Sequence, residues 1–139
     1  MGFALHFQQV NLRPGRPTLF ASRGAQLAFA LPGNPVSHWV VFQLFVAPLL
    51  RFLETGRPDA PVRLRGRLAS GSRPPATDGR PTFWPCHAAV VDGGYVITAL
   101  PLASSGDGAG LVGANALLPV PAQSDMLRAD AMVEFLPCR

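Results

Sequence analysis

Apolar and polar positions in the first part of the chain follow the pattern of short β-strands. Strand-like runs occupy residues 4–10, 18–22 and 25–30, and the last two flank a turn at residues 23–24. The segment between the first two runs is punctuated by prolines and a glycine, which indicates a loop. This half of the chain is therefore expected to start with extended segments.

A helix is predicted directly after these runs. Asn34 is a favoured N-cap residue, and Pro35 suits the first helical position because its missing N–H needs no partner there. Apolar side chains then recur at helical spacing at Val36, Val40, Val41, Leu44 and Phe45. Pro48 is expected to kink or end the regular hydrogen-bond ladder, with a further turn to about Leu53.

The second part of the chain has the alternation that is typical of β-strands. Residues 62–68 read VRLRGRL, which places arginines on one face and apolar residues on the other. The runs 81–91 and 95–100 flank Asp-Gly-Gly, a hairpin turn signal, and further short strands are expected at 116–120 and 131–136. Several short strands in about 80 residues predict a small barrel or sandwich.

Two loose segments divide the chain. Residues 54–61 hold two prolines and a glycine directly after the long apolar segment, which indicates a helix stop and an extended link. Residues 69–79 are rich in Gly, Ser and Pro and are expected to form a surface loop. The first of these segments is the expected domain boundary, with an α/β unit at 1–57 and an all-β unit at 58–139.

The composition narrows the function classes. The chain has 139 residues and a net charge of +4, and all twelve of its basic residues are arginines. An apolar content of 48% argues against intrinsic disorder, and the longest apolar run, residues 39–50, is shorter than the about 20 residues of a membrane span. Two cysteines without CxxC spacing and no signal-peptide pattern leave a cytoplasmic protein as the default. Scattered arginines without an RNP-like aromatic motif argue against nucleic acid as a partner.

Two segments carry candidate chemistry. Residues 31–37 read LPGNPVS, so a glycine turn leads into a helix whose first N–H groups and serine hydroxyl suit an oxyanion. Residues 11–18 read NLRPGRPT, in which two prolines stiffen a loop that presents two guanidinium groups. Each segment also has a purely structural interpretation, as a helix cap and as a solvated turn. Together they favour the same ligand class, an anion such as phosphate.

The same two segments resemble the C-terminal region of the molybdopterin molybdotransferases, the molybdenum insertases of the MoeA/gephyrin type. That family has a V-x-[ML]-K-P-G-K-P segment, a strand pair, the sequence G-L-P-G-N-P-V-S and a helix, and residues 3–53 match this order and spacing. Residues 79–83 (GRPTF) resemble the family's G-R-x-E-F, with Thr82 in place of the acid, and residues 114–118 resemble its A-N-x-L-x segment. The resemblance implies the last strands and helix of a molybdopterin-binding α/β domain, followed by a small C-terminal β-barrel.

The resemblance also implies a reaction and a set of site residues. Family members insert molybdate into adenylylated molybdopterin and release AMP, assisted by Mg²⁺. The positions that match catalytic residues are Arg13, Arg16 and Ser37. The positions that match residues around molybdate and the molybdopterin phosphate are Pro17, Gly33, Asn34, Pro35, Arg80 and Ser105. No metal ligand is expected in this chain. The implied partners are the two substrates, and either a second copy or a chain that supplies the missing N-terminal region.

Two departures from the family pattern argue against catalytic activity of this chain alone. Arg13 and Arg16 stand where the family usually has lysine, and a planar guanidinium cannot reproduce a compact ammonium. The family's S-G-G-x-S-x-G-D-type segment has no counterpart. The chain is therefore expected to begin within the α/β domain, to expose a sheet edge and apolar surface, and not to turn over alone. The alternative is a non-catalytic module that binds an oxyanion, or pairs with a partner chain as one half of a split protein.

Overall fold

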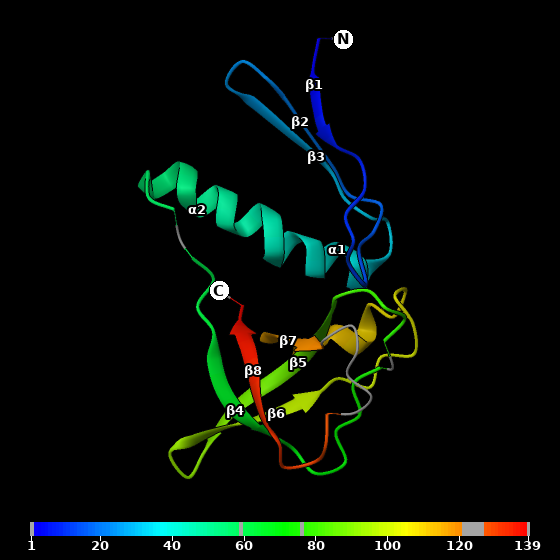
Figure 1. Cartoon of the computed structure of the whole chain (residues 1–139), viewed down its shortest axis with the longest axis vertical. Coiled ribbons are helices and arrows are strands. Elements are labelled where there is room, and N and C mark those ends of the chain that lie inside the picture. The colour runs from blue at the N-terminus through cyan, green and yellow to red at the C-terminus, as the bar shows by residue number, and fades with distance from the viewer. Residues whose placement is uncertain (1, 59, 76, 121–126, 139) are drawn as a thin grey trace.

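The fold consists of a small sheet, one long helix and a barrel, arranged in that order (Figure 1). The computed structural model describes residues 2–58, 60–75, 77–120 and 127–138. The helix crosses the molecule between the sheet and the barrel, as Figure 1 shows. This arrangement confirms the expected combination of a partial α/β unit and a small β-barrel.

The sheet has three antiparallel strands in the order of the chain. These are β1 (Ala4–Phe7), β2 (Leu19–Arg23) and β3 (Gln26–Ala30). β1 ends three residues earlier than predicted because Val10 turns away and donates its N–H to the Arg16 carbonyl oxygen (3.0 Å). Among the described residues, the outer edges of β1 and β3 pair with no other strand, so the expected open sheet edge is present.

One continuous helix follows the sheet. It consists of α1 (Pro35–Val41), a π-helical turn (Phe42–Val46) and α2 (Ala47–Thr55). Pro48 breaks the regular ladder as predicted, but the helix does not stop at Leu53. The Ala47 N–H donates to the Phe42 carbonyl oxygen, and this wider turn accommodates the proline without ending the helix. Gly56 ends α2 in the left-handed conformation.

The helix is also long and apolar enough to cross a membrane by length and composition. It spans 21 residues from Pro35 to Thr55, and its most apolar window has a mean hydropathy of 1.5 and is 28% buried. The apolar run at residues 39–50 is too short for a span, but the helix that contains it is longer, so the expectation from that run does not hold for the whole helix. Core helices of globular domains meet the same criterion, and Val36 and Val40 are buried here.

The second part of the chain is a closed five-stranded barrel. Its strands are β4 (Leu64–Leu68), β5 (Thr82–Val91), β6 (Gly94–Ala99), β7 (Ala116–Val120) and β8 (Met132–Pro137). They lie in the order β4-β6-β5-β7-β8, and β4 closes the barrel by pairing with β6 and β8. In β4 the predicted alternation is confirmed, because Arg65 and Arg67 are exposed whereas Gly66 and Leu68 are buried.

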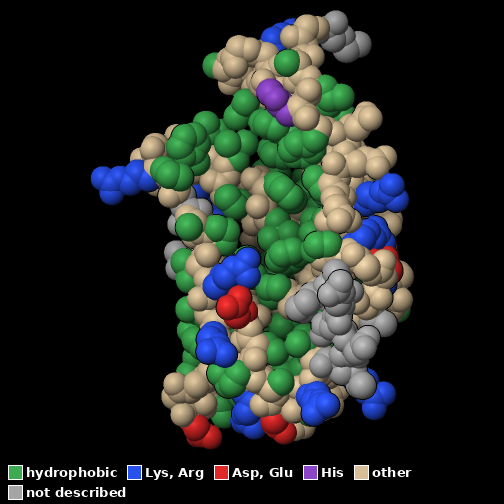
Figure 2. All heavy atoms as spheres, in the orientation of Figure 1, with side chains coloured by type: hydrophobic (Ala, Val, Ile, Leu, Met, Phe, Trp, Pro, Cys, Tyr) green, Lys and Arg blue, Asp and Glu red, His purple; other side chains and the backbone are tan. Residues whose placement is uncertain are grey.

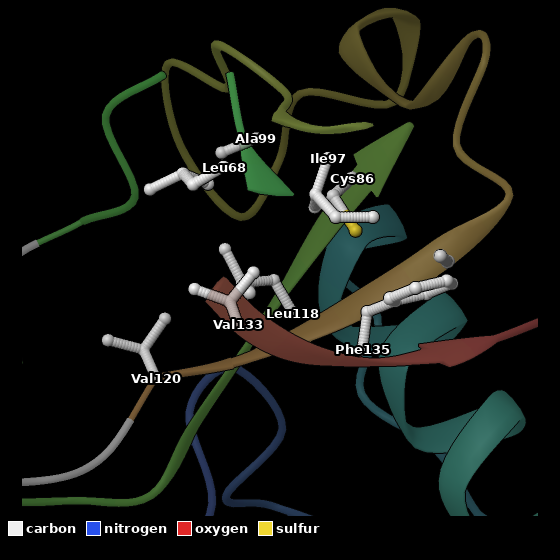
Figure 3. Packing of buried hydrophobic residues seen from close by; sticks show 9 residues of the cluster. Leu68, Cys86, Ile97, Ala99, Leu118, Val120, Val133 and Phe135 are labelled. Atoms are coloured by element: carbon white, nitrogen blue, oxygen red, sulfur yellow. The ribbon is translucent and has the colours of Figure 1, made fainter. Parts of the chain in front are cut away.

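Apolar side chains from all five strands fill the barrel (Figure 3). The buried members of this cluster include Leu68, Cys86, Ile97, Leu118, Val133 and Phe135. A second cluster joins the helix to the barrel and consists of Leu12, Val40, Val41, Leu117 and Leu136. The loop between β1 and β2 therefore shares a core with both α1 and the barrel.

The backbone of this loop also pairs with the barrel. The Arg13 N–H donates to the Pro81 carbonyl oxygen (3.0 Å), and the Phe83 N–H donates to the Arg13 carbonyl oxygen (2.8 Å). These two bonds form an isolated parallel bridge between Arg13 and Thr82, the first residue of β5. The loop is thus fixed between α1 on one side and the barrel on the other.

Gly15 lies at the closest approach of this loop to α1, and its replacement tests the packing. Its φ is +124°, and a Cβ would lie 2.5 Å from the Val41 Cγ2 atom. Gly15→Ala should lower the free energy of unfolding by about 1–3 kcal/mol in a urea titration. Gly24→Ala is the matched control, because Gly24 also has a positive φ but a Cβ there meets no atom within 4 Å. Equal losses of stability would contradict the close packing.

Candidate functional site

A cavity of about 500 Å³ opens where the loop before β2, the start of α1 and the barrel meet. Its size is within the range of small-molecule sites, about 300–1,000 Å³. Four arginines line it, together with Ser37, Trp84 and residues 100–105. We call this cavity, lined by Arg13, Arg16, Arg73 and Arg80, the arginine cleft.

The structure brings together most of the site residues that the sequence singled out. Those that line the arginine cleft are Arg13, Arg16, Pro17, Ser37, Arg80 and Ser105. Gly33, Asn34 and Pro35 are not among the lining residues and lie in the turn that leads into α1. Segments from both halves of the chain therefore converge on one cavity.

Hydrogen bonds hold the loop that carries Arg16 in a fixed shape. The N–H groups of Val10 and Thr18 both donate to the Arg16 carbonyl oxygen, at 3.0 and 2.9 Å. The buried Thr18 hydroxyl donates to the Gly15 carbonyl oxygen (2.7 Å). The Arg16 side chain donates from Nε to the Gln9 Oε1 atom (3.3 Å). A loop held in this way presents its guanidinium groups with a reduced entropic cost of binding.

The start of α1 forms another wall of the cleft. Ser37 is only 5% exposed, and its hydroxyl has no hydrogen-bond partner among the described residues. Asn34 occupies the N-cap position, but its side chain does not cap the helix, and its Nδ2 donates to the Ser105 Oγ atom (2.8 Å). The Ser105 carbonyl oxygen accepts the Val36 N–H (3.1 Å). The expected N-cap bond is thus replaced by a loop of the barrel, which ties α1 to it.

Asp78 places a negative charge beside two of the arginines. The Arg80 Nε donates to both carboxylate oxygens of Asp78 (3.0 and 3.2 Å), and the Arg13 Nη1 lies 3.9 Å from Oδ2. The hydrogen bonds from Arg80 lower the pKa of Asp78 from 3.8 to about 2, and the same pairing raises the pKa of Arg80. Among the described residues, Arg16 and Arg73 pair with no carboxylate.

The chemistry of these side chains suits an anion. Four guanidinium groups line the cleft and the Asp78 carboxylate lies beside two of them, so the cleft carries an excess of positive charge. The donor set does not fit Mg²⁺, which prefers carboxylate, carbonyl and water oxygens. Within the described ranges, no group of three or more His, Cys, Asp or Glu side chains could hold a metal ion.

The barrel half of the chain matches a known family. The family model described as the MoeA C-terminal region (domain IV) matches residues 65–138, which is more than half of the chain. The chain belongs to this family. The resemblance noted for residues 3–53 and the match to the barrel therefore point to the same group of proteins.

Individual relatives agree with the family match. The molybdenum cofactor synthesis protein cinnamon of Drosophila melanogaster is 52% identical over 50 residues, which are 36% of this chain and 8% of that protein. The molybdopterin molybdenumtransferase of Synechococcus elongatus is 37% identical over 86 residues, which are 60% of this chain and 20% of that protein.

Solved structures of similar proteins extend the match to the whole chain. A molybdenum cofactor biosynthesis protein from Pyrococcus furiosus is 30% identical with a TM-score of 0.71, covering 97% of this chain and 46% of that chain. The molybdopterin biosynthesis moeA protein from Pyrococcus horikoshii OT3 is 26% identical with a TM-score of 0.72, covering 96% and 32%. The chain spans less than half the length of each of these relatives.

The structure adds residues to the cleft of this MoeA C-terminal family member. Arg73, Trp84 and residues 100–104 line it, although the sequence analysis did not select them. One signal could have found Arg73, because each of the four cleft arginines precedes a proline and only Arg57 shares this feature elsewhere in the chain. A residue before proline is restricted to extended backbone, which helps to fix the direction of its side chain. Trp84 has no such signal, since aromatic residues are common in strands.

Asp107 shapes the serine side of the cleft. Its carboxylate accepts the N–H groups of Ala103 (3.1 Å) and Gly110 (2.9 Å), and these bonds lower its pKa. The loop that carries Ser105 is thereby closed on itself and held against the start of α1.

Removal of the Asp78 charge tests whether this carboxylate lowers the affinity of the cleft for anions. Asp78→Asn should bind phosphate more tightly in a calorimetric titration at pH 7, because Arg80 and Arg13 no longer face a competing carboxylate. Asp130→Asn is the matched control, since Asp130 pairs with Arg67 outside the cleft. An unchanged affinity in Asp78→Asn, or an equal gain in the control, would contradict this role.

The lowered pKa of Asp78 also predicts a dependence of stability on pH. The folded-state pKa lies below the ordinary value, so the pair stabilises the native chain above about pH 4 and loses this effect as the pH falls towards 2. In thermal melts followed by circular dichroism, Asp78→Asn should be less stable than the unchanged chain at pH 7, with the difference shrinking between pH 4 and 2. A difference that stays constant through this range would contradict the assignment.

Proposed function

We propose that the arginine cleft binds molybdate and the phosphate of adenylylated molybdopterin, and that the chain serves the insertion of molybdate into that compound with release of AMP. The observation that carries this proposal is the convergence of the cleft arginines with the Ser37 hydroxyl in one cavity. The names of the relatives support it, because they include a molybdenum cofactor synthesis protein and a molybdopterin molybdenumtransferase.

Guanidinium groups suit the proposed ligands physically. Each presents its N–H donors in a planar fork that matches two oxygens of a tetrahedral oxyanion. Arg13 and Arg16 stand where the family usually has lysine, so the positive charge is kept while the bonding becomes bidentate. In this proposal the two arginines neutralise the oxyanion and the Ser37 hydroxyl donates one hydrogen bond to it. Arg80 and Ser105 border the same space from the barrel side.

Binding of molybdate and phosphate requires fewer groups than turnover does. The relatives are longer than the matched region, and the donor set of the cleft does not supply ligands for Mg²⁺. We propose that turnover also requires the segment that carries the family's S-G-G-x-S-x-G-D-type sequence.

Single replacements in the cleft test the binding proposal. Arg16→Ala and Ser37→Ala should each weaken molybdate binding by about 1.5–3 kcal/mol in isothermal titration, the loss expected for one hydrogen bond to a charged group. Arg65→Ala is the matched control, because it removes the same charge from an exposed position of β4 outside the cleft. Thermal melts of all variants check that the fold is kept. Equal affinities in the three variants would contradict the assignment of the cleft.

Turnover is tested separately from binding. The 139-residue chain should bind molybdate but release no AMP from adenylylated molybdopterin, and release should appear when a chain carrying the missing segment is added. AMP release is measured by chromatography with and without molybdate. Molybdate-dependent release by the 139 residues alone would contradict the need for that segment.

A second candidate function is favoured by the apolar surface. Large exposed apolar side chains lie on the sheet, on the residue before it and on α2, and they include Phe3, Leu5, Leu27, Leu50, Phe52 and Leu53. Figure 2 shows hydrophobic side chains gathered over this part of the molecule. Such a surface favours a module that pairs with a partner chain. Sedimentation should show self-association that Leu53→Glu reduces, whereas a monodisperse monomer at all concentrations would count against this candidate.

A further inference from the structure

The barrel loop that carries Ser105 is docked against the start of α1 by hydrogen bonds and by packing. The Asn34 Nδ2 donates to the Ser105 Oγ atom (2.8 Å), and the N–H of the buried Val36 donates to the Ser105 carbonyl oxygen (3.1 Å). Gly108 of the same loop lies so close to Pro35 that a Cβ on this glycine would be 3.3 Å from the Pro35 Cβ atom. The contact fixes both the backbone and the side chain of Ser105.

The Ser105 hydroxyl keeps its proton for a ligand. A hydroxyl has one O–H donor and two acceptor lone pairs. The Ser105 oxygen accepts the Asn34 amide, and among the described residues its O–H donates to no group. Because the amide N–H occupies one side of the oxygen, the hydroxyl proton must point away from Asn34. Ser105 lines the arginine cleft whereas Asn34 does not, so Asn34 can act on a bound ligand only through Ser105.

Helix capping does not explain why position 34 holds an amide. Asn and Asp are about equally favoured at the N-cap, and the Asn34 side chain caps no N–H group of α1. The two side chains differ because an amide can donate a hydrogen bond, whereas an ionised carboxylate can only accept one. A carboxylate at this position would accept the Ser105 O–H, and the Ser105 oxygen would then face the ligand with its lone pairs. The amide therefore sets the polarity of the Ser105 hydroxyl.

We propose that Asn34 is a positioning residue that turns the Ser105 hydroxyl proton towards the arginine cleft. This makes the cleft selective for oxyanions that only accept hydrogen bonds, over oxyanions that carry protons of their own. Molybdate without a proton needs a donor at Ser105, whereas a protonated anion can donate its own O–H to the Ser105 lone pairs. The proposal rests on the proposed function, because the anion must lie in the cleft.

The experiment measures the binding of molybdate and of inorganic phosphate to the full 139-residue chain by isothermal titration at pH 6.5. At this pH phosphate carries at least one proton and molybdate carries none. Asn34→Asp should weaken molybdate binding by about 10- to 150-fold, the loss of one hydrogen bond to a charged group, and should weaken phosphate binding less. The ratio of the two affinities is the readout, because a distorted cleft would bind both anions less well.

A double-mutant cycle separates the hydroxyl from the added charge. The new carboxylate repels anions whether or not the hydroxyl is present, so Asn34→Asp is repeated in a Ser105→Ala background. There the substitution should change the ratio of affinities much less than it does in the unchanged chain.

Asn34→Ala is a second variant that removes the amide without adding a charge. It should weaken molybdate binding less than Asn34→Asp does, because the released hydroxyl can still rotate towards the anion. Thermal melts show whether each variant is folded. Unchanged affinities for both anions in Asn34→Ala would contradict the positioning role, even if Asn34→Asp does not fold.

The outcomes distinguish this proposal from the one on which it rests. If molybdate binds and Arg16→Ala weakens it, but Asn34→Asp lowers both affinities by the same factor, Asn34 only packs the loop and the anion cleft stands. If the ratio shifts equally in the Ser105→Ala background, the added charge alone causes the shift and the positioning role is wrong. If neither anion binds the unchanged chain, the proposed function fails and the positioning role fails with it.

Discussion

Two backbone hydrogen bonds between Arg13 and the start of β5 hold the site together. They join a loop of the sheet to the barrel, at 3.0 and 2.8 Å, and they fix the loop at the seam between the two. Leu12 on one side of this bridge enters the cluster shared by α1 and the barrel, and Gly15 on the other side allows the loop to touch Val41. This pairing places the cationic loop beside Arg80 at the mouth of the common cleft.

The positions of the charges in the cleft depend on neighbours in the sequence as well as on the fold. Each cleft arginine precedes a proline, which limits the backbone to extended conformations before any ligand arrives. Asp78 engages Arg80 and lies near Arg13, so like charges can be held close together without a bound anion. Among the described residues, Arg16 and Arg73 pair with no carboxylate, so their positive charge is available to a ligand. The cleft thus combines restrained and available cations, which suits a ligand that carries several oxygens.

The sequence predicted the elements well where one local signal dominates. The period of two in β4, the hairpin at residues 92–94 and the helix start at Pro35 all have local causes, and the structure confirms them. Family motifs led to Arg13, Arg16, Ser37, Arg80 and Ser105, which all line one cavity. Trp84 was missed because its place at the cleft depends on contacts between distant segments, whereas Arg73 and Asp78 had local signals, the proline after Arg73 and the closeness of Asp78 to Arg80, that were not used. Asn34 is the N-cap residue, as predicted, but its side chain donates to Ser105 of the barrel instead of capping the helix, a contact between distant segments that the sequence does not reveal.

The most direct test of the central claim is a crystal structure of the chain grown with molybdate, recorded at the molybdenum absorption edge. The anomalous signal locates the metal without reference to any assumed binding site. We expect a peak in the arginine cleft, with oxygens within hydrogen-bonding distance of the Arg13 and Arg16 guanidinium groups and the Ser37 hydroxyl. A well-occupied peak elsewhere, with the cleft empty, would contradict it.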